Sequence, residues 1–406
     1  MSTLTVDLVE SQELEAMGNS LEDQIARLRQ DPLAAIERGI EDLGFAAQRD
    51  AFWVALLSCV SAAAESPFSV LLVGNPASGK STVASAVANL VGPDFVVSTS
   101  SLSHVTAAAA SRLAERLTHH CLVCDERASN GAFDGLWRQA LSGRPASQII
   151  TLQGEPVELT VMPPISSVEA VLTDKEMSPQ DRSRYLRIRL REDEEASLII
   201  RALARQSGTV EGRRRQHRLD VLSQACQVFL VSLRRDLFVH VPFAGQIALD
   251  DNGFAIRTEQ QIIRATQTVA WLCQHGRAVS WDEDAGDFIQ ATPADYRLVW
   301  EILLRSGEDG SVDLSDNALL VFRTWKQWVA AHGDVPRSRL QMDDFLKPRL
   351  STWQVYHALA ELIELGLADG PVKRGVRCSY RLTDLGRATQ RPNAFQSLPR
   401  PGDLQA

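Results

Sequence analysis

Residues 67–81 read PFSVLLVGNPASGKS, and this stretch decides the fold. The apolar run from Phe68 to Val73 predicts a buried β-strand. The following residues, from Gly74 to Ser81, fit the pattern G-x-x-x-x-G-K-[ST] of a P-loop, or Walker A motif. Apolar residues at helical spacing then predict a helix from Lys80 to Val91. A strand, a glycine-rich loop and a helix in this order are the context in which the motif binds nucleotide, and they argue against a chance glycine-rich turn.

The residue types in this loop suit phosphate chemistry. Glycines let the backbone curl so that successive N–H groups point at phosphate oxygens, and the helix N-terminus adds its positive dipole end. We expect Lys80 to reach the β- and γ-phosphates and the Ser81 hydroxyl to ligate Mg²⁺. The sequence therefore predicts ATP and Mg²⁺ as cofactors. The expected nucleotide-binding residues of the loop are Gly74, Asn75, Pro76, Ala77, Ser78, Gly79, Lys80, Ser81 and Thr82.

A second motif follows about 45 residues later, in the run HCLVCDE at 120–126. Its apolar part predicts a strand that ends in Asp125 and Glu126. An Asp in this place can hold the magnesium ion, and the following Glu can polarise the attacking water, as in a Walker B motif. Two adjacent carboxylates at a strand end are alternatively a simple solvent cap on the sheet. Cys121 and Cys124 have no second pair at zinc-site spacing, so we expect buried apolar residues rather than a metal site.

The order of elements around these motifs is typical of an α/β protein. Further strands are predicted at 94–98, 165–173 and 185–190, with helices between them and a β-hairpin at 149–161. Strands that alternate with helices predict a parallel sheet covered on both faces. Residues 193–305 are predicted to be mostly helical.

One arginine stands where the last strand of this sheet begins. In Ser183-Arg184-Tyr185, the Arg184 guanidinium can project across a subunit boundary and neutralise charge that develops on a neighbour's γ-phosphate. Arg182 is the competing candidate for this arginine finger. Alternatively, Arg184 is a surface residue that pairs locally with Asp181 or Glu192.

Length and composition set the remaining limits. The chain has 406 residues, of which 45% are hydrophobic and 23% charged, with a net charge of −9. These values are typical of a globular protein of two to three domains. No apolar run reaches the roughly 18 residues of a membrane helix, and the polar N-terminus does not resemble a signal peptide. We therefore expect a cytoplasmic protein without a membrane partner. The acidic balance does not exclude nucleic acid, because local basic patches decide that contact.

In this order the motifs resemble AAA+ ATPases. Within them, the chain is most similar to the minichromosome-maintenance-like helicase domain of replication proteins of bacterial mobile elements and prophages. The resemblance covers roughly residues 50–385. It is carried by the P-loop and its strand, by STSSLS at 98–103, by HHCLVCDE at 119–126, by RQALSG at 138–143, by Ser183-Arg184-Tyr185, by VPFA at 241–244 and by residues 257–274.

This resemblance implies an AAA+ P-loop fold with a helical lid and further site residues. Thr173 becomes the polar sensor at the end of the fourth core strand, with Ser167 as competitor. Arg257 becomes the lid arginine that senses the γ-phosphate, with Arg264 as competitor. The hairpin around Gln153 corresponds to a loop that faces a central pore and touches DNA. The implied assembly is a homo-oligomer, a hexameric ring or spiral, with DNA as partner.

Two departures from the family pattern affect these expectations. Many relatives carry a zinc-binding and primase region in front, whereas about 65 residues without a metal-ligand cluster precede the first core strand here. We expect that the protein does not prime by itself and that a separate primase or another replication or mobile-element protein is a partner. The hairpin tip, from Gln153 to Glu155, has no lysine or arginine, which argues against a strong grip on DNA.

The C-terminal part is predicted to be a winged helix. In a helix over 351–366, capped by Ser351, the apolar residues Val355, Leu359, Leu362 and Ile363 face a core, and Trp353 and Tyr356 are expected in the core as well. A basic turn between two short strands follows. The expected DNA contacts are Ser351, Thr352, Gln354 and His357 on the helix and Lys373, Arg374 and Arg377 on the wing. A winged helix that binds protein is the alternative.

The expected domains are an N-terminal helical segment at 1–64, an α/β core at 65–192, a helical lid region at 193–310, a winged helix at 311–389 and a disordered tail at 390–406. Two functions fit this organisation. One is an ATP-dependent DNA helicase or translocase that acts as a ring in mobile-element replication. The other is an ATP switch that binds DNA and recruits or loads a partner without unwinding, as helicase loaders and transposition regulators do.

Overall fold

The computed structural model of the chain describes residues 21–42, 44–101, 113, 115–127, 131–152, 155–172, 177, 179–192, 194–249, 255–308, 316–333, 337–338, 341, 350–364, 367–374, 377–383, 395 and 398–405. The chain divides into two compact units, with the main boundary after Leu303. The first unit also takes in residues 398–405, whereas the second contains the elements between 316 and 383.

A parallel sheet forms the centre of the first unit. In the described part of the chain it has five strands, in the order β2-β3-β6-β1-β7, and all neighbouring pairs are parallel. The strands are β1 (Ser69–Val73), β2 (Val96–Ser101), β3 (Cys121–Glu126), β6 (Ser166–Val171) and β7 (Tyr185–Arg189). All residues of β1 and β6 are buried, as strands covered on both faces require. The predicted α/β class with a parallel sheet between helices is therefore confirmed.

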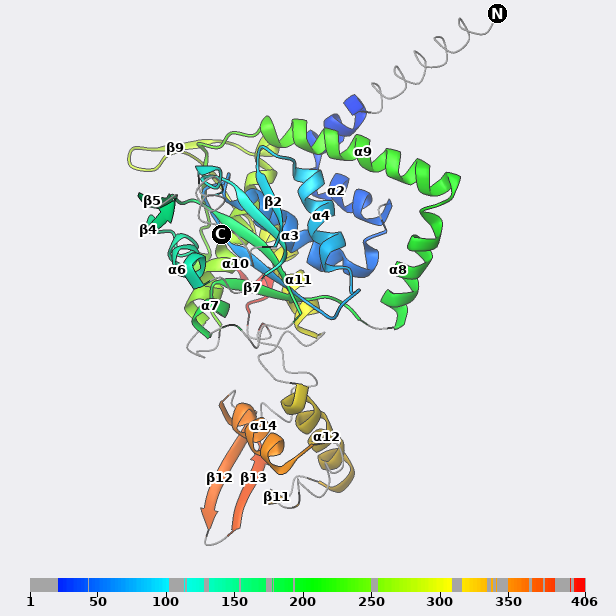
Figure 1. Cartoon of the computed structure of the whole chain (residues 1–406), viewed down its shortest axis with the longest axis vertical. Helices are drawn as coiled ribbons and strands as arrows, with labels where there is room; N and C mark the ends of the chain where they lie inside the picture. Colours follow the sequence, from blue (N-terminus) through cyan, green and yellow to red (C-terminus); the bar gives the residue numbers. More distant parts are fainter. Residues whose placement is uncertain are drawn as a thin grey trace, which may run out of the picture. The chain divides into compact units, whose positions relative to one another are not determined.

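Two layers cover the sheet (Figure 1). On one face lie α3 (Arg49–Ser61) and α4 (Lys80–Val91), which contact both each other and the strands. The other face is covered by α6 (Gly131–Ala140) and the antiparallel pair β4 (Ala146–Leu152) and β5 (Glu155–Val161). Trp137, Leu122 and Leu159 belong to one buried cluster on that face. The predicted hairpin is confirmed and is longer than the sequence suggested.

Further helices surround this core. They are residues 21–30, α2 (Pro32–Asp42), η1 (Ala46–Gln48), α7 (Pro179–Arg182), α8 (Glu194–Gln206), α9 (Val210–Val231), η2 (Ala244–Gln246), α10 (Ala255–Leu272), η3 (Gln274–Gly276) and α11 (Pro293–Glu308). Helix α9 packs on α4 and α2, and α10 packs on α3. Helices α8, α9 and α10 of the expected lid region lie in the same compact unit as the sheet, and α11 crosses the boundary after Leu303.

The mostly helical prediction for 193–305 was wrong in one place. A small sheet, in the order β8-β10-β9, is formed by β8 (Phe238–His240), β9 (Ser280–Asp282) and β10 (Gly286–Gln290). These strands have three to five residues, too few for an alternating pattern to be visible. The β9–β10 turn is held by the Asp282 carboxylate, which accepts hydrogen bonds from the backbone N–H groups of Asp284 and Ala285.

The end of the chain also differs from the expectation of disorder. Pro401 opens a short 3₁₀-helix, η4 (Pro401–Asp403), and the side chains of Leu398, Pro401 and Leu404 are buried. Gln246 and Gln405 exchange two hydrogen bonds between side-chain amide and backbone, at 2.8 and 3.0 Å. The proline-rich composition suggested disorder, but three apolar residues at this spacing suffice to dock the segment.

The second unit has two helices and an antiparallel sheet in its described part. These are α12 (Asp316–His332), α14 (Thr352–Glu364) and strands β11 (Arg337–Ser338), β12 (Ala368–Arg374) and β13 (Arg377–Leu382), in the order β11-β13-β12. Its core includes Val355, Leu359 and Leu362, with Ile363 packed against it, so the predicted inner face of α14 is confirmed. The two short strands predicted after this helix are confirmed as β12 and β13.

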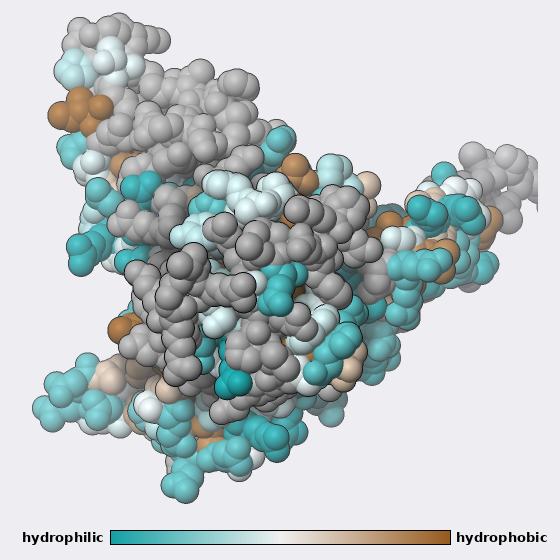
Figure 2. Space-filling view, turned by 90° about the horizontal axis from the view of Figure 1, so that it is seen from below, coloured by the Kyte–Doolittle hydropathy of each residue, from teal (hydrophilic) through white to brown (hydrophobic). Residues whose placement is uncertain are grey.

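Among the described residues, exposed apolar ones do not gather on the face seen in Figure 2. Among the residues coloured there, hydrophobic ones lie as scattered spots between hydrophilic ones. Such single exposed residues are ordinary on protein surfaces. In the described residues no helix is long and apolar enough to cross a membrane.

Candidate functional site

The P-loop lies where the sequence analysis predicted it. It leaves the carboxyl end of β1 and enters α4, whose first residue is Lys80. Gly79 has φ +96°, a backbone conformation that residues with a side chain rarely adopt. A Cβ atom at Gly74 would lie 2.7 Å from the Ser78 Oγ and 3.1 Å from a Glu192 carboxylate oxygen. Both glycines are thus required by the path of the loop rather than by the motif alone.

Lys80 is folded over the start of the loop. Its Nζ donates to the carbonyl oxygens of Gly74 at 2.5 Å and Asn75 at 2.8 Å. Burial lowers the pKa of Lys80, and the nearby Glu192 carboxylate opposes this shift. Ser81 and Thr82, in the first turn of α4, are exposed. An ammonium group and two hydroxyls therefore border the helix N-terminus, as phosphate and Mg²⁺ binding requires.

Two residues that contact the loop were missed from the sequence. Glu192 follows β7, and its carboxylate accepts hydrogen bonds from the backbone N–H and the side-chain amide of Asn75, both at 2.5 Å. Gln48 is buried and donates to the carbonyl oxygens of Ser78 and Arg191. Neither residue belongs to a motif, because they reach the loop from segments distant in sequence. The contact of Glu192 also indicates that the donors of this loop attract an anion.

Asp125 and Glu126 end β3 at the same edge of the sheet. Because β6 alone lies between β1 and β3 and all three are parallel, the residues after these strands meet at one edge. Asp125 is half-buried, and burial raises its pKa above the ordinary value. The Glu126 side chain is exposed. Two carboxylates thus lie at the same edge of the sheet as the P-loop. Thr173, the predicted polar sensor, lies outside the described residues.

Its competitor, Ser167, is engaged elsewhere. It is fully buried near the start of β6, and its hydroxyl donates to the Glu169 carboxylate at 2.9 Å. The side chain therefore lies in the interior, away from the carboxyl edge where a sensor would contact phosphate.

A pocket of about 450 Å³ lies at the opposite, amino edge of the sheet. Ser69, the first residue of β1, and Arg184, just before β7, belong to its wall. Its basic lining residues come from three segments that are distant in sequence: Arg138, Arg144, Arg184, Arg257 and Arg264. We call this cavity the arginine pocket. Five guanidinium groups around one cavity are suited to bind a polyanion such as a phosphate chain.

Hydrogen bonds fix these arginines at the wall of the pocket. Arg184 Nε donates to the Arg138 carbonyl at 3.1 Å and to the Ser142 hydroxyl at 3.0 Å. Arg257 donates to the Ser183 hydroxyl at 2.5 Å, and Arg264 to the Pro67 carbonyl at 2.9 Å. The pKa of Arg184 is lowered by burial first and then by the charge of Arg257. An anion in the pocket would relieve this repulsion.

The pocket brings together predicted residues that the sequence could not relate. Arg257, expected as the lid arginine, lies beside Ser183 and Arg184 at the amino edge, together with its competitor Arg264. This edge is opposite the chain's own P-loop. The Asp181 carboxylate, a proposed local partner of Arg184, binds Arg138 with both oxygens at 2.6 and 3.1 Å. Arg182, the other finger candidate, has a buried Nε without a hydrogen-bond partner in the described structure.

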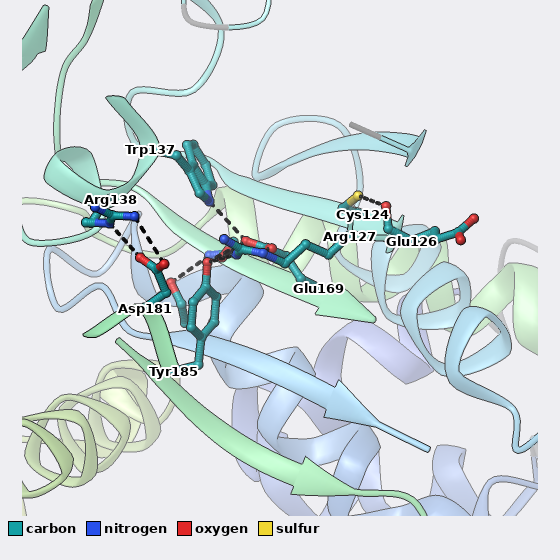
Figure 3. Close-up of polar contacts among 10 residues, drawn as sticks. Cys124, Glu126, Arg127, Trp137, Arg138, Glu169, Asp181 and Tyr185 are labelled. Atoms are coloured by element: carbon teal, nitrogen blue, oxygen red, sulfur yellow. Dashed lines mark hydrogen bonds and ion pairs between the residues drawn. The ribbon is translucent and has the colours of Figure 1, made fainter. Parts of the chain in front are cut away.

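Between the two edges lies a buried polar cluster, which the sequence analysis also missed (Figure 3). Its centre is Glu169, in the middle of β6 and fully buried. The carboxylate accepts hydrogen bonds from Arg127 at 2.6 Å, Tyr185 at 2.8 Å and Trp137 at 3.0 Å, and from Ser167. A charged residue inside a strand of otherwise small, uncharged residues, SSVEAV, was the signal that could have revealed it.

The expected DNA contacts of α14 are only partly available. Ser351 and Gln354 form a capping box, in which the Gln354 side chain accepts from the Ser351 N–H at 2.8 Å. Thr352 and His357 are exposed. The expectation that Trp353 and Tyr356 lie in the core was wrong, because they are 69% and 49% exposed. Val355 and Leu359 fill the inner face of the helix, and Trp353 instead packs on His357, with ring centroids 4.1 Å apart.

The remaining predicted contacts are located only by their backbone. Lys373 and Arg374 end β12, and Arg377 begins β13, on either side of the predicted wing. Gln153, at the hairpin tip, lies outside the described residues. Cys121 and Cys124 are buried in β3, as expected, and no group of metal-ligating residues occurs within the described residues.

No protein-family model matches the sequence, and no curated protein matches it.

Proposed function

We propose that this protein is a Mg²⁺-dependent ATPase of the AAA+ class. The observation that carries the proposal is the carboxyl edge of the sheet. There a loop with the full P-loop pattern joins β1 to α4, and β3 ends in Asp125 and Glu126 one strand away. Lys80 and the N-terminus of α4 suit the phosphates, Ser81 and Asp125 suit Mg²⁺, and Glu126 suits the activation of water.

The arginine pocket supports an oligomer as the active form. Its guanidinium groups lie at the edge of the sheet opposite the chain's own P-loop, so they are remote from the nucleotide that this chain would bind. A second copy that presents its P-loop at this pocket would bring Arg184 and Arg257 to its γ-phosphate. We propose that both residues act on the neighbour's ATP, in a ring or spiral of identical chains.

Lys80→Ala is the test of the ATPase itself. We expect the variant to fold, because within the described residues the Lys80 side chain bonds to loop carbonyls alone, and to lose ATP turnover by at least about 10³-fold. Turnover and nucleotide affinity are measured on the purified full chain, with Lys326→Ala on α12 as the matched control. Unchanged turnover in Lys80→Ala would remove the basis of the proposal.

The activity that we propose for the assembled ATPase is DNA unwinding or translocation in mobile-element replication. The motifs that resemble AAA+ helicases support this. The second unit supports it as well, because its helix α14 packs on an antiparallel sheet, as in a winged helix. The expected result is ATP-dependent strand displacement on a forked DNA substrate, abolished in Lys80→Ala.

A second candidate is an ATP switch that binds DNA and loads a partner protein. The specific observation in its favour is the exposed pair Trp353 and Tyr356 on α14, since exposed aromatic residues are enriched at protein interfaces. The hairpin tip, from Gln153 to Glu155, has no lysine or arginine, which agrees with this candidate. A protein that hydrolyses ATP on DNA but never displaces a strand from the fork would favour this candidate over the helicase.

A further inference from the structure

Glu169 connects the two edges of the sheet through residues that are direct neighbours of the proposed site residues. On one side it binds Arg127, which follows Glu126 in the chain. On the other it binds Tyr185, which follows Arg184, and Trp137, which precedes Arg138. The Glu169 carboxylate therefore binds three residues. Each of them is adjacent in sequence to a proposed site residue at the carboxyl edge of the sheet or in the arginine pocket.

The contact with Arg127 is the strongest part of this cluster. Arg127 Nη1 lies 2.6 Å from Glu169 Oε2 and 2.5 Å from the Tyr185 hydroxyl, and its guanidinium lies over the Tyr185 ring. Both charged side chains are largely buried, with 13% and 0% exposure. Burial by itself lowers the pKa of Arg127, but the opposing effects of Tyr185 and Glu169 are larger and raise it overall. Removing one of the two side chains would leave the other buried without its ionic partner.

Two further hydrogen bonds hold the end of β3, next to this ion pair. The backbone N–H of Arg127 donates to the Ala170 carbonyl at 3.0 Å, next to Glu169 in β6. The Cys124 thiol donates to the Glu126 carbonyl at 3.1 Å. Figure 3 shows the Arg127 side chain directed toward Glu169 and Tyr185 and the Glu126 side chain directed away from them. With residue 127 held on both its backbone and its side chain, the direction of Glu126 is restricted.

We propose that Glu169 is a positioning residue that orients Glu126 for water activation by holding Arg127. Glu169 does not touch the nucleotide; it acts through the guanidinium and the end of β3. Through Tyr185 and Trp137, Glu169 also fixes the backbone beside Arg184 and Arg138. One side chain thus holds residues at both edges of the sheet. This proposal rests on ATP hydrolysis at the P-loop, as proposed above.

Glu169→Gln tests the proposal in the full chain. The amide keeps the size of the side chain but cannot accept charge-assisted hydrogen bonds from all four donors. We expect kcat for ATP to fall by about 10²-fold, because a misplaced general base loses most of its contribution. The KM for ATP should change by less than about threefold, since the P-loop contacts are untouched.

Two further variants separate positioning from stability. Asp295→Asn is the matched control: Asp295 forms an equally buried ion pair with Arg277, 2.5 Å apart, without a contact to the P-loop or the arginine pocket in the described structure. It should lower Tm and leave kcat unchanged. The double variant Glu169→Gln with Arg127→Met removes both charges, so it should regain much of the Tm lost in Glu169→Gln. Its kcat should stay low, because residue 127 is still not held. Recovery of kcat along with Tm would overturn the proposal.

Hydrogen exchange provides a readout that is independent of catalysis. Without nucleotide, Glu169→Gln should speed exchange in the peptide that covers residues 121–127, and Asp295→Asn should not. Unchanged exchange in this peptide would overturn the positioning role, whatever the ATPase activity. If the wild-type chain bound no ATP, the proposed function would fail instead, and the exchange result would still decide whether Glu169 orders the end of β3.

Discussion

The two edges of the parallel sheet differ in how they are built. At the carboxyl edge, the proposed phosphate and magnesium groups come from two short contiguous stretches, 74–82 and 125–126. At the amino edge, the arginine pocket draws on segments around 67, 138–144, 183 and 257–264. In our proposal, the first edge would bind phosphate with backbone N–H groups and one lysine, and the second with guanidinium groups alone. The first edge would then be a complete half-site in each chain, whereas the second would become functional only against another chain.

The largest effect is expected from Glu126→Gln, which tests the carboxyl edge. The variant should bind ATP with unchanged affinity, since the P-loop is intact, and turn it over about 10³-fold more slowly because the general base is lost. Binding is measured with a fluorescent ATP analogue and turnover by phosphate release. Loss of ATP binding would mean that Glu126 supports the fold rather than the chemistry.

Arg184→Ala tests the amino edge. The variant should lose about 10²–10³-fold of its turnover in the assembled state, as expected for an arginine finger, and keep its affinity for ATP. If the amino edge acts only on a neighbour's ATP, a dilute, unassembled wild type should hydrolyse ATP at the same low rate as the variant. If the variant were slower than the wild type under both conditions, Arg184 would act within its own chain.

Arg257→Ala should have a smaller effect at the same edge. Arg257 contributes a second cation to the pocket through its contact with Ser183, and we expect about tenfold slower turnover in the assembled state. Arg218→Ala, which removes an exposed ion pair with Glu211 on α9, is the matched control and should leave the rate unchanged. A loss of ATP affinity in the isolated chain would mean instead that Arg257 reads the nucleotide of its own chain.

Glu192→Gln should show the smallest effect, and in the opposite direction. The Glu192 carboxylate holds both the backbone N–H and the amide of Asn75, at the place where phosphate oxygens are expected. Removing its charge should tighten ATP binding about threefold, since a weak electrostatic repulsion disappears. Glu195→Gln, an exposed neighbour on α8, is the control. Weaker binding in Glu192→Gln would mean that the carboxylate shapes the loop rather than competes with phosphate.

The sequence predicted what is local and missed what depends on the fold. The P-loop, Asp125 and Glu126 are contiguous, and their strands and helices have clear periodicity, so the carboxyl edge could be assembled from the chain alone. Arg257 illustrates what sequence reasoning misses. It lies beside Ser183, but the two residues are 74 positions apart in the sequence, and nothing near Arg257 indicates the contact. Glu169 is a second residue whose role could not be predicted from the sequence. Its role depends on Arg127, Trp137 and Tyr185, which only the strand order β3-β6-β1-β7 and the packing of α6 bring together.

Trp353 shows why exposure is hard to predict for aromatic residues. In α14 the positions at 355, 359 and 362 already fill the core, so Trp353 falls on the outer face whatever its hydrophobicity. The segment at 398–405 shows the opposite error. Its proline-rich composition predicted disorder, but three of its side chains are buried.

The claim that each active site is shared between two chains is tested most directly by mixing two inactive variants. Neither Lys80→Ala nor Arg184→Ala alone should hydrolyse ATP at an appreciable rate. In a mixed assembly, a chain with an intact P-loop meets a neighbour with an intact Arg184 at some interfaces. We predict that mixing equal amounts restores a substantial fraction of wild-type turnover. If the mixture stays as inactive as its two components, although both variants are shown to co-assemble, the arginine pocket does not complete a neighbour's site.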